Sequence, residues 1–129
     1  MEKKLQEHGM RLTPQRLELA KVIRELGYRH PSFNEIYRAV KAKQPNVSRS
    51  TVLGNLKSMI KLGLIGSFNF KGETHYEMNL QLHVNLAESN GLIRDIKNEE
   101  IIKHLQDIAR LIREGEGIQI KSLLVLAEQ

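Results

Sequence analysis

The sequence contains no cysteine, which excludes disulfide bonds and every metal site built on thiolates. No apolar run reaches the roughly 18 residues that a membrane-spanning helix needs. The N-terminal segment MEKKLQEHGM lacks the apolar core of an export signal. We therefore expect a protein of a reducing compartment, the cytoplasm.

Catalytic motifs are also missing. The chain has no nucleophile–base pair at recognisable spacing, no glycine-rich phosphate loop and no metal motif of the hydrolytic type. The KG pair at 71–72 fits a hairpin turn rather than a phosphate cradle. We therefore expect a protein that is not an enzyme.

Basic residues gather in the first part of the chain. Residues 1–80 hold 14 Lys/Arg and 7 Asp/Glu, whereas residues 81–129 hold 6 and 8, within a formal net charge of +5. A clustered positive field is typical of nucleic-acid binding, although charged faces also serve solubility alone.

The first part is predicted to be helical. Thr13 before Pro14 is a helix start, and Ser32 with Glu35 three residues later forms a capping box. Ser48 can cap a further helix. Apolar residues recur with the helical period over residues 3–8, 14–26, 33–43 and 49–62.

The helix after Ser48 has one apolar face and one slim face of small, hydroxyl and basic residues. From residue 64 the apolar period changes to 2, and LIGSFNF, a KG turn and ETHYEMN predict a β-hairpin. This order is that of a winged helix, whose last helix enters a DNA groove. We predict a winged helix-turn-helix DNA-binding domain over residues 1–79.

Residues 80–129 predict a small α/β dimerisation domain, which makes the fold class α+β. LHVNLAE and LIRDI indicate strands, Asn98 caps a helix over 99–113, and GIQIKSLLVLAE (117–128) is expected to close the chain as a strand. Its LLVL run is apolar on both faces, so both should be covered. About 50 residues cannot do this alone, which predicts pairing with a second copy.

Five segments resemble the ferric uptake regulator family in order and spacing: GMRLTPQRLELAKVI, RHPSFNEIYRAVK, STVLGNLKSMIKLGLI, FNFKGETHYEM and GLIRDI. RHPSFNEIY is most similar to the peroxide-sensing branch. The family comprises dimeric, metal-responsive, DNA-binding proteins, most of which repress transcription. The resemblance implies a homodimer on a palindromic operator of double-stranded DNA, with no membrane partner.

The metal sites depart from the family pattern. A structural zinc held by two CxxC pairs is absent, because the thiolates are absent. For the regulatory metal, the resemblance implies four ligands: His30, Glu77, His83 and Asp95. Asn85 occupies the position where the family has a second histidine. One divalent ion per subunit, Fe, Mn or Zn, is one interpretation. The other is a decayed site in which His30 is a hydrogen-bonding residue and both carboxylates are solvated.

The remaining histidines are less favoured as metal ligands. His75 shares a strand face with Glu77, so it is either a substitute ligand or an exposed residue of the hairpin. His8 and His104 lie among charged neighbours and are expected on the surface.

The DNA-facing helix also departs, because the family's TVYR or TIYN is TVLG here, with Leu53 and Gly54. Either Leu53 contacts a thymine methyl group, or base readout is weak and phosphate contacts dominate. Gly54 either permits close approach of the helix to the duplex or is a product of evolutionary drift without a function. The candidate DNA-binding residues are Arg11, Arg16, Arg49, Ser50, Thr51, Leu53, Gly54, Lys57, Lys61 and Lys71. A metal-independent winged helix acting through protein–protein contacts or mixed dimers is the alternative function.

Overall fold

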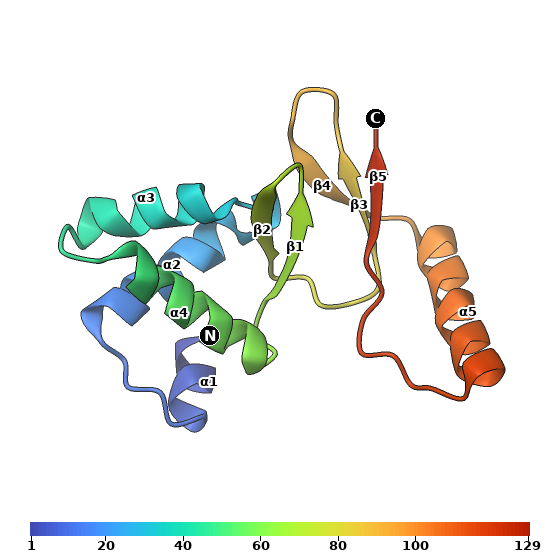
Figure 1. Cartoon of the computed structure of the whole chain (residues 1–129), viewed down its shortest axis with the longest axis horizontal. Coiled ribbons are helices and arrows are strands. Elements are labelled where there is room, and N and C mark those ends of the chain that lie inside the picture. Colours follow the sequence, from blue (N-terminus) through green and yellow to red (C-terminus); the bar gives the residue numbers. More distant parts are fainter. The chain divides into compact units, whose positions relative to one another are not determined.

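The computed structural model describes all residues, 1–129. The chain divides into two compact units, Met1–Leu80 and Gln81–Gln129 (Figure 1). The first is helical with one β-hairpin and the second is α/β, which confirms the predicted α+β class. No helix is both long enough and apolar enough to cross a bilayer. The roles assigned above to 1–79 and 80–129, DNA binding and dimerisation, stay predictions.

The helices of the first unit begin where their capping residues predict. Thr13, Ser32 and Ser48 each accept a backbone N–H of the following helix through their side chains, and the capping box of Ser32 and Glu35 is complete. These bonds satisfy donors that a helix start leaves unpaired. The helices are α1 (Glu2–Glu7), α2 (Pro14–Leu26), the 3₁₀ turn η1 (Gly27–Arg29), α3 (Phe33–Lys43) and α4 (Arg49–Lys61).

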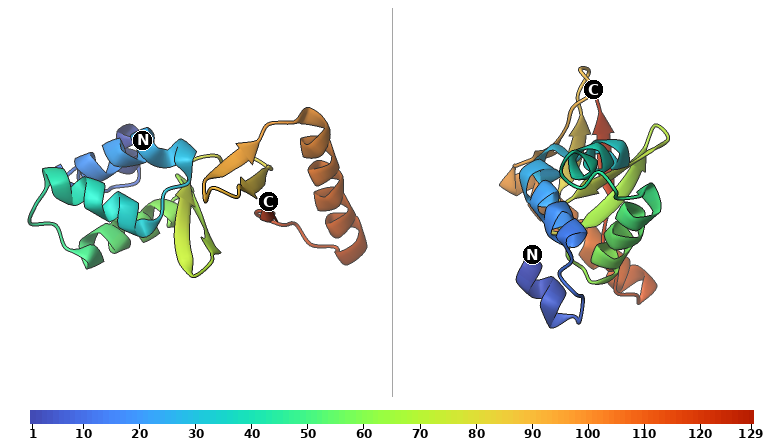
Figure 2. Two further views of the ribbon diagram at one scale, coloured as in Figure 1. Left: turned by 90° about the horizontal axis from the view of Figure 1, so that it is seen from above. Right: turned by 90° about the vertical axis from the view of Figure 1, so that its left-hand side faces the viewer.

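The apolar faces of these helices meet in one core. Ile23 of α2, Ile36 and Val40 of α3, and Leu56 and Met59 of α4 are at most 1% exposed. Both views in Figure 2 show α2, α3 and α4 gathered around this core. Because α4 buries only its apolar face, its opposite face stays accessible.

The hairpin consists of antiparallel strands β1 (Gly66–Phe70) and β2 (Glu73–Glu77). Lys71 and Gly72 form the two-residue turn, both with positive φ (51° and 79°), which suits the twist of paired strands. The backbone N–H of Tyr76 donates to the carbonyl oxygen of Pro31 at 2.9 Å. The segment before α3 is thereby attached to β2, as a wing is attached to its helices.

The second unit contains a three-stranded sheet in the order β4-β3-β5. β3 (Val84–Ala87) pairs antiparallel with β4 (Ile93–Ile96) and parallel with β5 (Val125–Glu128). Helix α5 (Glu99–Glu116) begins at the Asn98 cap and lies to one side of the sheet (Figure 1). It is three residues longer than the predicted 99–113 and ends at Gly117 in the left-handed conformation.

The closing strand is shorter than predicted, because only Val125–Glu128 of residues 117–128 joins the sheet. β5 pairs with β3 over residues 84–87, so residues 117–124 have no strand beside them. The LLVL run is not fully covered within the single chain, where Leu124 is 55% exposed, as expected for a unit too small to cover both faces alone. Other large apolar side chains of this unit are also exposed: Leu92, Ile108, Leu111 and Ile118.

Candidate functional site

Helix α4 presents a basic, acid-free surface. Its sequence RSTVLGNLKSMIK contains no carboxylate, and Arg49, Lys57 and Lys61 are exposed while Val52, Leu56 and Met59 are buried. Helical spacing places Lys57 and Lys61 on the same face, one turn apart. The helix therefore has the charge that contact with a phosphate backbone requires.

The hydroxyl groups at the start of α4 already have partners within the helix. Ser48 Oγ accepts the Thr51 N–H at 3.1 Å and donates to Thr51 Oγ1 at 2.9 Å, while Ser50 Oγ lies 3.2 Å from Ser48 Oγ. Ser50 is exposed and Thr51 is half-buried. These two candidates therefore contribute to the cap and remain at the accessible end of the helix.

Leu53 and Gly54 lie on the accessible side of α4. Leu53 is 38% exposed. A Cβ added at Gly54 would meet no protein atom within 4 Å. Packing within the chain therefore gives no reason for a glycine at this position, which costs about 1 kcal/mol of helix stability relative to alanine.

The remaining basic candidates flank α4. Arg16 on α2 donates from Nε to Asn55 Oδ1 of α4 at 2.9 Å and from Nη1 to the carbonyl oxygen of Arg11 at 2.8 Å. Arg11 is exposed. Lys71 occupies the wing turn, with its Nζ 5.2 Å from the centroid of the Phe70 ring. Arg16 thus holds the start of α2 against α4, in addition to any contact that it makes with a ligand.

Arg49 is held by two aromatic rings and one amide of α3. Its guanidinium carbon lies 5.0 Å from the centroid of the Phe33 ring and 4.9 Å from that of Tyr37, and Nη2 donates to Asn34 Oδ1 at 2.7 Å. The two rings are stacked, with an interplanar angle of 8°. The spacing of Phe33 and Tyr37 fits an apolar stripe equally well, so no sequence signal separates the two roles.

In the first unit, His30 and Glu77 form a buried imidazole–carboxylate pair. His30 Nε2 lies 3.5 Å from Glu77 Oε2, and the two residues are 3% and 9% exposed. His30 adopts the left-handed conformation (φ 52°) directly after η1, while Glu77 is the last residue of β2. The interpretation of Glu77 as a solvated carboxylate is therefore wrong, because this side chain is withdrawn from solvent.

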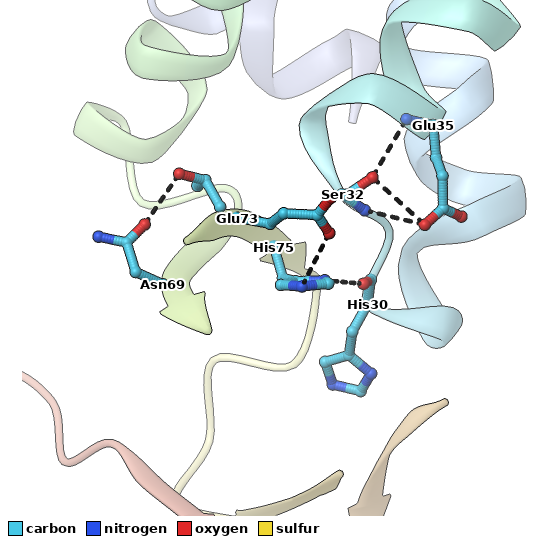
Figure 3. A network of polar contacts seen from close by, with 7 residues as sticks. His30, Ser32, Glu35, Asn69, Glu73 and His75 are labelled. Atoms are coloured by element: carbon cyan, nitrogen blue, oxygen red, sulfur yellow. Dashed lines mark hydrogen bonds and ion pairs between the residues drawn. The ribbon is translucent and has the colours of Figure 1, made fainter. Parts of the chain in front are cut away.

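His75, which lies on β2 like Glu77, contacts the backbone of His30 (Figure 3). Its Nδ1–H donates to the carbonyl oxygen of His30 at 2.8 Å, and its ring stacks on Phe68 with centroids 5.6 Å apart. Its side chain is only 12% exposed, with Nε2 3.9 Å from Glu73 Oε2. The expectation of an exposed hairpin residue is wrong, because the ring packs beneath the backbone turn at His30.

In the second unit, His83, Asn85 and Asp95 converge at paired strands. Nδ1 of His83 lies 2.6 Å from the carbonyl oxygen of Gln81, while Nε2 lies 3.5 Å from Asp95 Oδ1 and 3.1 Å from Asn85 Oδ1. Both ring nitrogens therefore face oxygen acceptors: Nδ1–H donates to the Gln81 carbonyl, and Nε2 faces the Asn85 amide oxygen and the Asp95 carboxylate. Metal-binding histidines are commonly oriented in this way.

Tyr76 of β2 is 3% exposed, and burial raises the pKa of its phenol above the usual value. His8 and His104, expected on the surface, are both exposed.

A wing attached to three capped helices, with a basic acid-free face on the last of them, defines a winged-helix protein of the DNA-binding class. The profile described as "Ferric uptake regulator family" matches residues 7–125. The chain belongs to this family. It is a DNA-binding transcription regulator rather than an enzyme, as the absence of catalytic motifs led us to expect.

Individual relatives agree with this assignment. A ferric uptake regulation protein homolog of Archaeoglobus fulgidus is 43% identical over 98 residues, which cover 76% of each chain. The peroxide-responsive repressor PerR of Staphylococcus epidermidis is 27% identical over 111 residues, covering 80% of this chain and 73% of PerR. The structure of a zinc-bound manganese uptake regulator superposes with a TM-score of 0.72 at 27% identity, covering 99% of this chain and 97% of that one.

Proposed function

We propose that the protein is a homodimeric repressor that binds a palindromic operator in the cytoplasm, with α4 of each protomer in a major groove. The observation that carries this proposal is the exposed face of α4, which contains basic, hydroxyl and small side chains and no carboxylate. Lys57, Lys61 and wing Lys71 contact phosphates, while Leu53 and Gly54 face base edges. Arg11 and Arg16, at the start of α2, contact the phosphate backbone of the DNA.

Dimerisation is assigned to the second unit. Its exposed apolar side chains belong to α5, to the loop before β4 and to the segment before β5. Apolar area of this kind is costly in a monomer and is typical of an interface between subunits. A two-fold dimer would present two copies of α4 to the two halves of a palindrome.

The experiment is selection of duplex DNA by the purified full chain, followed by titration of the recovered sequence at several salt concentrations. We expect a palindrome and an affinity that falls steeply with salt, because bound phosphates release counterions. Replacing Lys57 and Lys61 by alanine should reduce the slope of log K against log salt by about 2.

The matched control replaces Lys97 and Lys103 of the second unit, which are also exposed, and should leave the slope unchanged. Recovery of no sequence above background, or an unchanged slope in the Lys57/Lys61 variant, contradicts DNA binding through α4. A mixed dimer with a relative that cannot shift DNA would instead support the protein-interaction function.

We further propose that one divalent metal ion per subunit regulates this binding through His30, Glu77, His83 and Asp95. The two imidazoles and two carboxylates are a donor set that can hold a metal ion, and it suits Fe, Mn or Zn. The contact of His83 Nδ1 with a backbone carbonyl supports this, since the second ring nitrogen of a metal-binding histidine commonly donates to such a group. A bound metal would stabilise one DNA-binding conformation of the dimer.

Asn85 and His75 are assigned supporting roles: Asn85 contacts the His83 ring, and His75 donates to the His30 backbone. Elemental analysis of the purified protein tests the metal assignment, together with selection of DNA with and without added metal. Stoichiometric metal and metal-dependent affinity are expected. Equal affinity with and without metal would contradict regulation.

A further inference from the structure

The first unit contains a groove of about 510 Å³ between the starts of α3 and α4 and the wing. One wall is formed by Arg49, Ser50 and Leu53 of α4, and the other by residues of the wing that include Tyr76. Phe33 and Asn34 of α3 close one side. None of these groups takes part in the imidazole–carboxylate pair of this unit, so the groove is a separate feature.

Arg49 is the basic residue of this groove, and it is already fixed in the chain without a ligand. Two ring faces and the Asn34 amide hold its guanidinium at 5.0, 4.9 and 2.7 Å. A guanidinium has five N–H donors, and the bond to Asn34 uses one of them. An arginine held in this way loses little conformational entropy when it binds an anion.

We propose that this groove holds one sugar–phosphate strand of the operator, with Arg49 as a preformed phosphate ligand and Phe33, Tyr37 and Asn34 as its positioning residues. The inference rests on the proposed binding of DNA by α4. In a winged-helix complex the recognition helix lies in a major groove and the wing lies on the adjacent backbone. The DNA strand that borders this major groove then runs between the helix and the wing. The groove has those two walls.

The other charged residue of the groove is Glu73 of the wing. Its carboxylate is 58% exposed and lies 3.9 Å from His75 Nε2. A carboxylate near a phosphate strand opposes binding. Glu73→Gln should therefore strengthen binding to all DNA sequences, about twofold to threefold at low salt.

The test compares variants of the full chain by titration with the selected operator and with a random duplex. Arg49→Gln should lower the slope of log K against log salt by about 0.9 and weaken binding by about eightfold at 0.1 M salt, as expected for one phosphate contact. The loss should be equal on both duplexes, because phosphate contacts carry no sequence information.

Tyr37→Leu and Asn34→Ala test the positioning role separately. Each retains Arg49, so the salt slope should stay unchanged while affinity falls about fivefold, because the guanidinium must now be ordered on binding. Tyr37→Phe is the matched control: it keeps the ring and loses only the hydroxyl that accepts from Lys41 Nζ at 3.0 Å. Its affinity should equal that of the parent chain.

The outcomes separate this inference from the proposed function. If the parent chain binds no DNA, both are overturned. If the parent chain binds with a steep salt dependence and Arg49→Gln shows the same slope, the groove inference alone is overturned. If Asn34→Ala and Tyr37→Leu lower the melting temperature without lowering affinity, Arg49 only joins α4 to α3, and the positioning role is overturned.

Discussion

The Nδ1 atom of His75 lies 2.8 Å from the carbonyl oxygen of His30, so the wing supports the backbone turn that presents the His30 imidazole. His30 has φ 52°, a left-handed conformation that few residues other than glycine adopt. The same strand carries Glu77, whose carboxylate faces that imidazole at 3.5 Å. β2 therefore determines both the backbone and the side-chain environment of His30.

Replacing His75 by phenylalanine should lower the free energy of unfolding by about 1 kcal/mol, measured by urea titration. The ring can still stack on Phe68, but the hydrogen bond to the His30 carbonyl is lost. Glu73→Gln serves as the control. It removes an exposed charge at 3.9 Å from the same ring, and should change stability by less than about 0.5 kcal/mol. Equal effects in the two variants would contradict a structural role for the His75 bond.

Conservative changes at the first imidazole–carboxylate pair should abolish the metal response. His30→Asn is preferred to alanine because asparagine tolerates positive φ, and Glu77→Gln keeps the shape of the side chain. Each should weaken metal affinity at least about tenfold and leave DNA binding insensitive to metal, while sedimentation still shows a dimer. A normal metal response in both variants would remove these residues from the ligand set.

Gly54→Ala should separate stability from DNA affinity. The added methyl group meets no protein atom within 4 Å, so helix stability should increase by about 1 kcal/mol. If α4 approaches the duplex closely at this position, the methyl group crowds the base edges and operator affinity should fall about tenfold. Thermal unfolding and DNA titration of the same preparation measure the two effects. Unchanged affinity would show that Gly54 does not lie against DNA.

Leu124→Asp should weaken the homodimer. Leu124 is 55% exposed in the segment before β5, and a charge placed in an apolar interface costs more than 1 kcal/mol. Sedimentation over a range of concentrations should show at least about tenfold weaker dimerisation. Lys121→Asp is the control, since Lys121 lies in the same segment and is already exposed and charged. Equal dissociation in both variants would place the interface elsewhere.

Stability should decrease at alkaline pH because of Tyr76. Burial raises its pKa in the folded chain, whereas in the unfolded chain the phenol titrates near pH 10. Above that pH the unfolded chain binds fewer protons than the folded chain, so the free energy of unfolding falls by at most about 1.4 kcal/mol per pH unit. Urea titrations between pH 8 and 11 should show a shallower decline for Tyr76→Phe than for Tyr28→Phe, whose parent side chain is 80% exposed.

Local chemistry accounts for the features that could be predicted from the sequence. Thr13, Ser32 and Ser48 cap helices through bonds to residues three positions away, and the two-residue turn of the wing depends on positive φ at adjacent positions. Such contacts are short in sequence, so motif and spacing are sufficient to identify them. The order of the capped helices and the hairpin along the chain then predicts a winged helix.

Contacts between elements could not be predicted in the same way. The length of β5 depends on the four residues of β3 beside it, and an apolar run alone does not indicate where its partner ends. Arg49 lies over the rings of Phe33 and Tyr37, and His75 donates to the backbone of His30, which is 45 residues away in the sequence. These contacts depend on how separate elements pack, which spacing within one element does not indicate. Periodicity indicates that a ring lies on the inner face of a helix, but not which group contacts it.

If the exposed apolar side chains of the second unit form the proposed dimer interface, the fraction of dimer depends on the concentration of the chain. Dimerisation of the folded state would also make the stability of this unit depend on the concentration of protomers. A cell that makes little of the protein would then hold mostly monomers, and operator occupancy would rise with the square of expression. The amount of protein would then itself influence regulation.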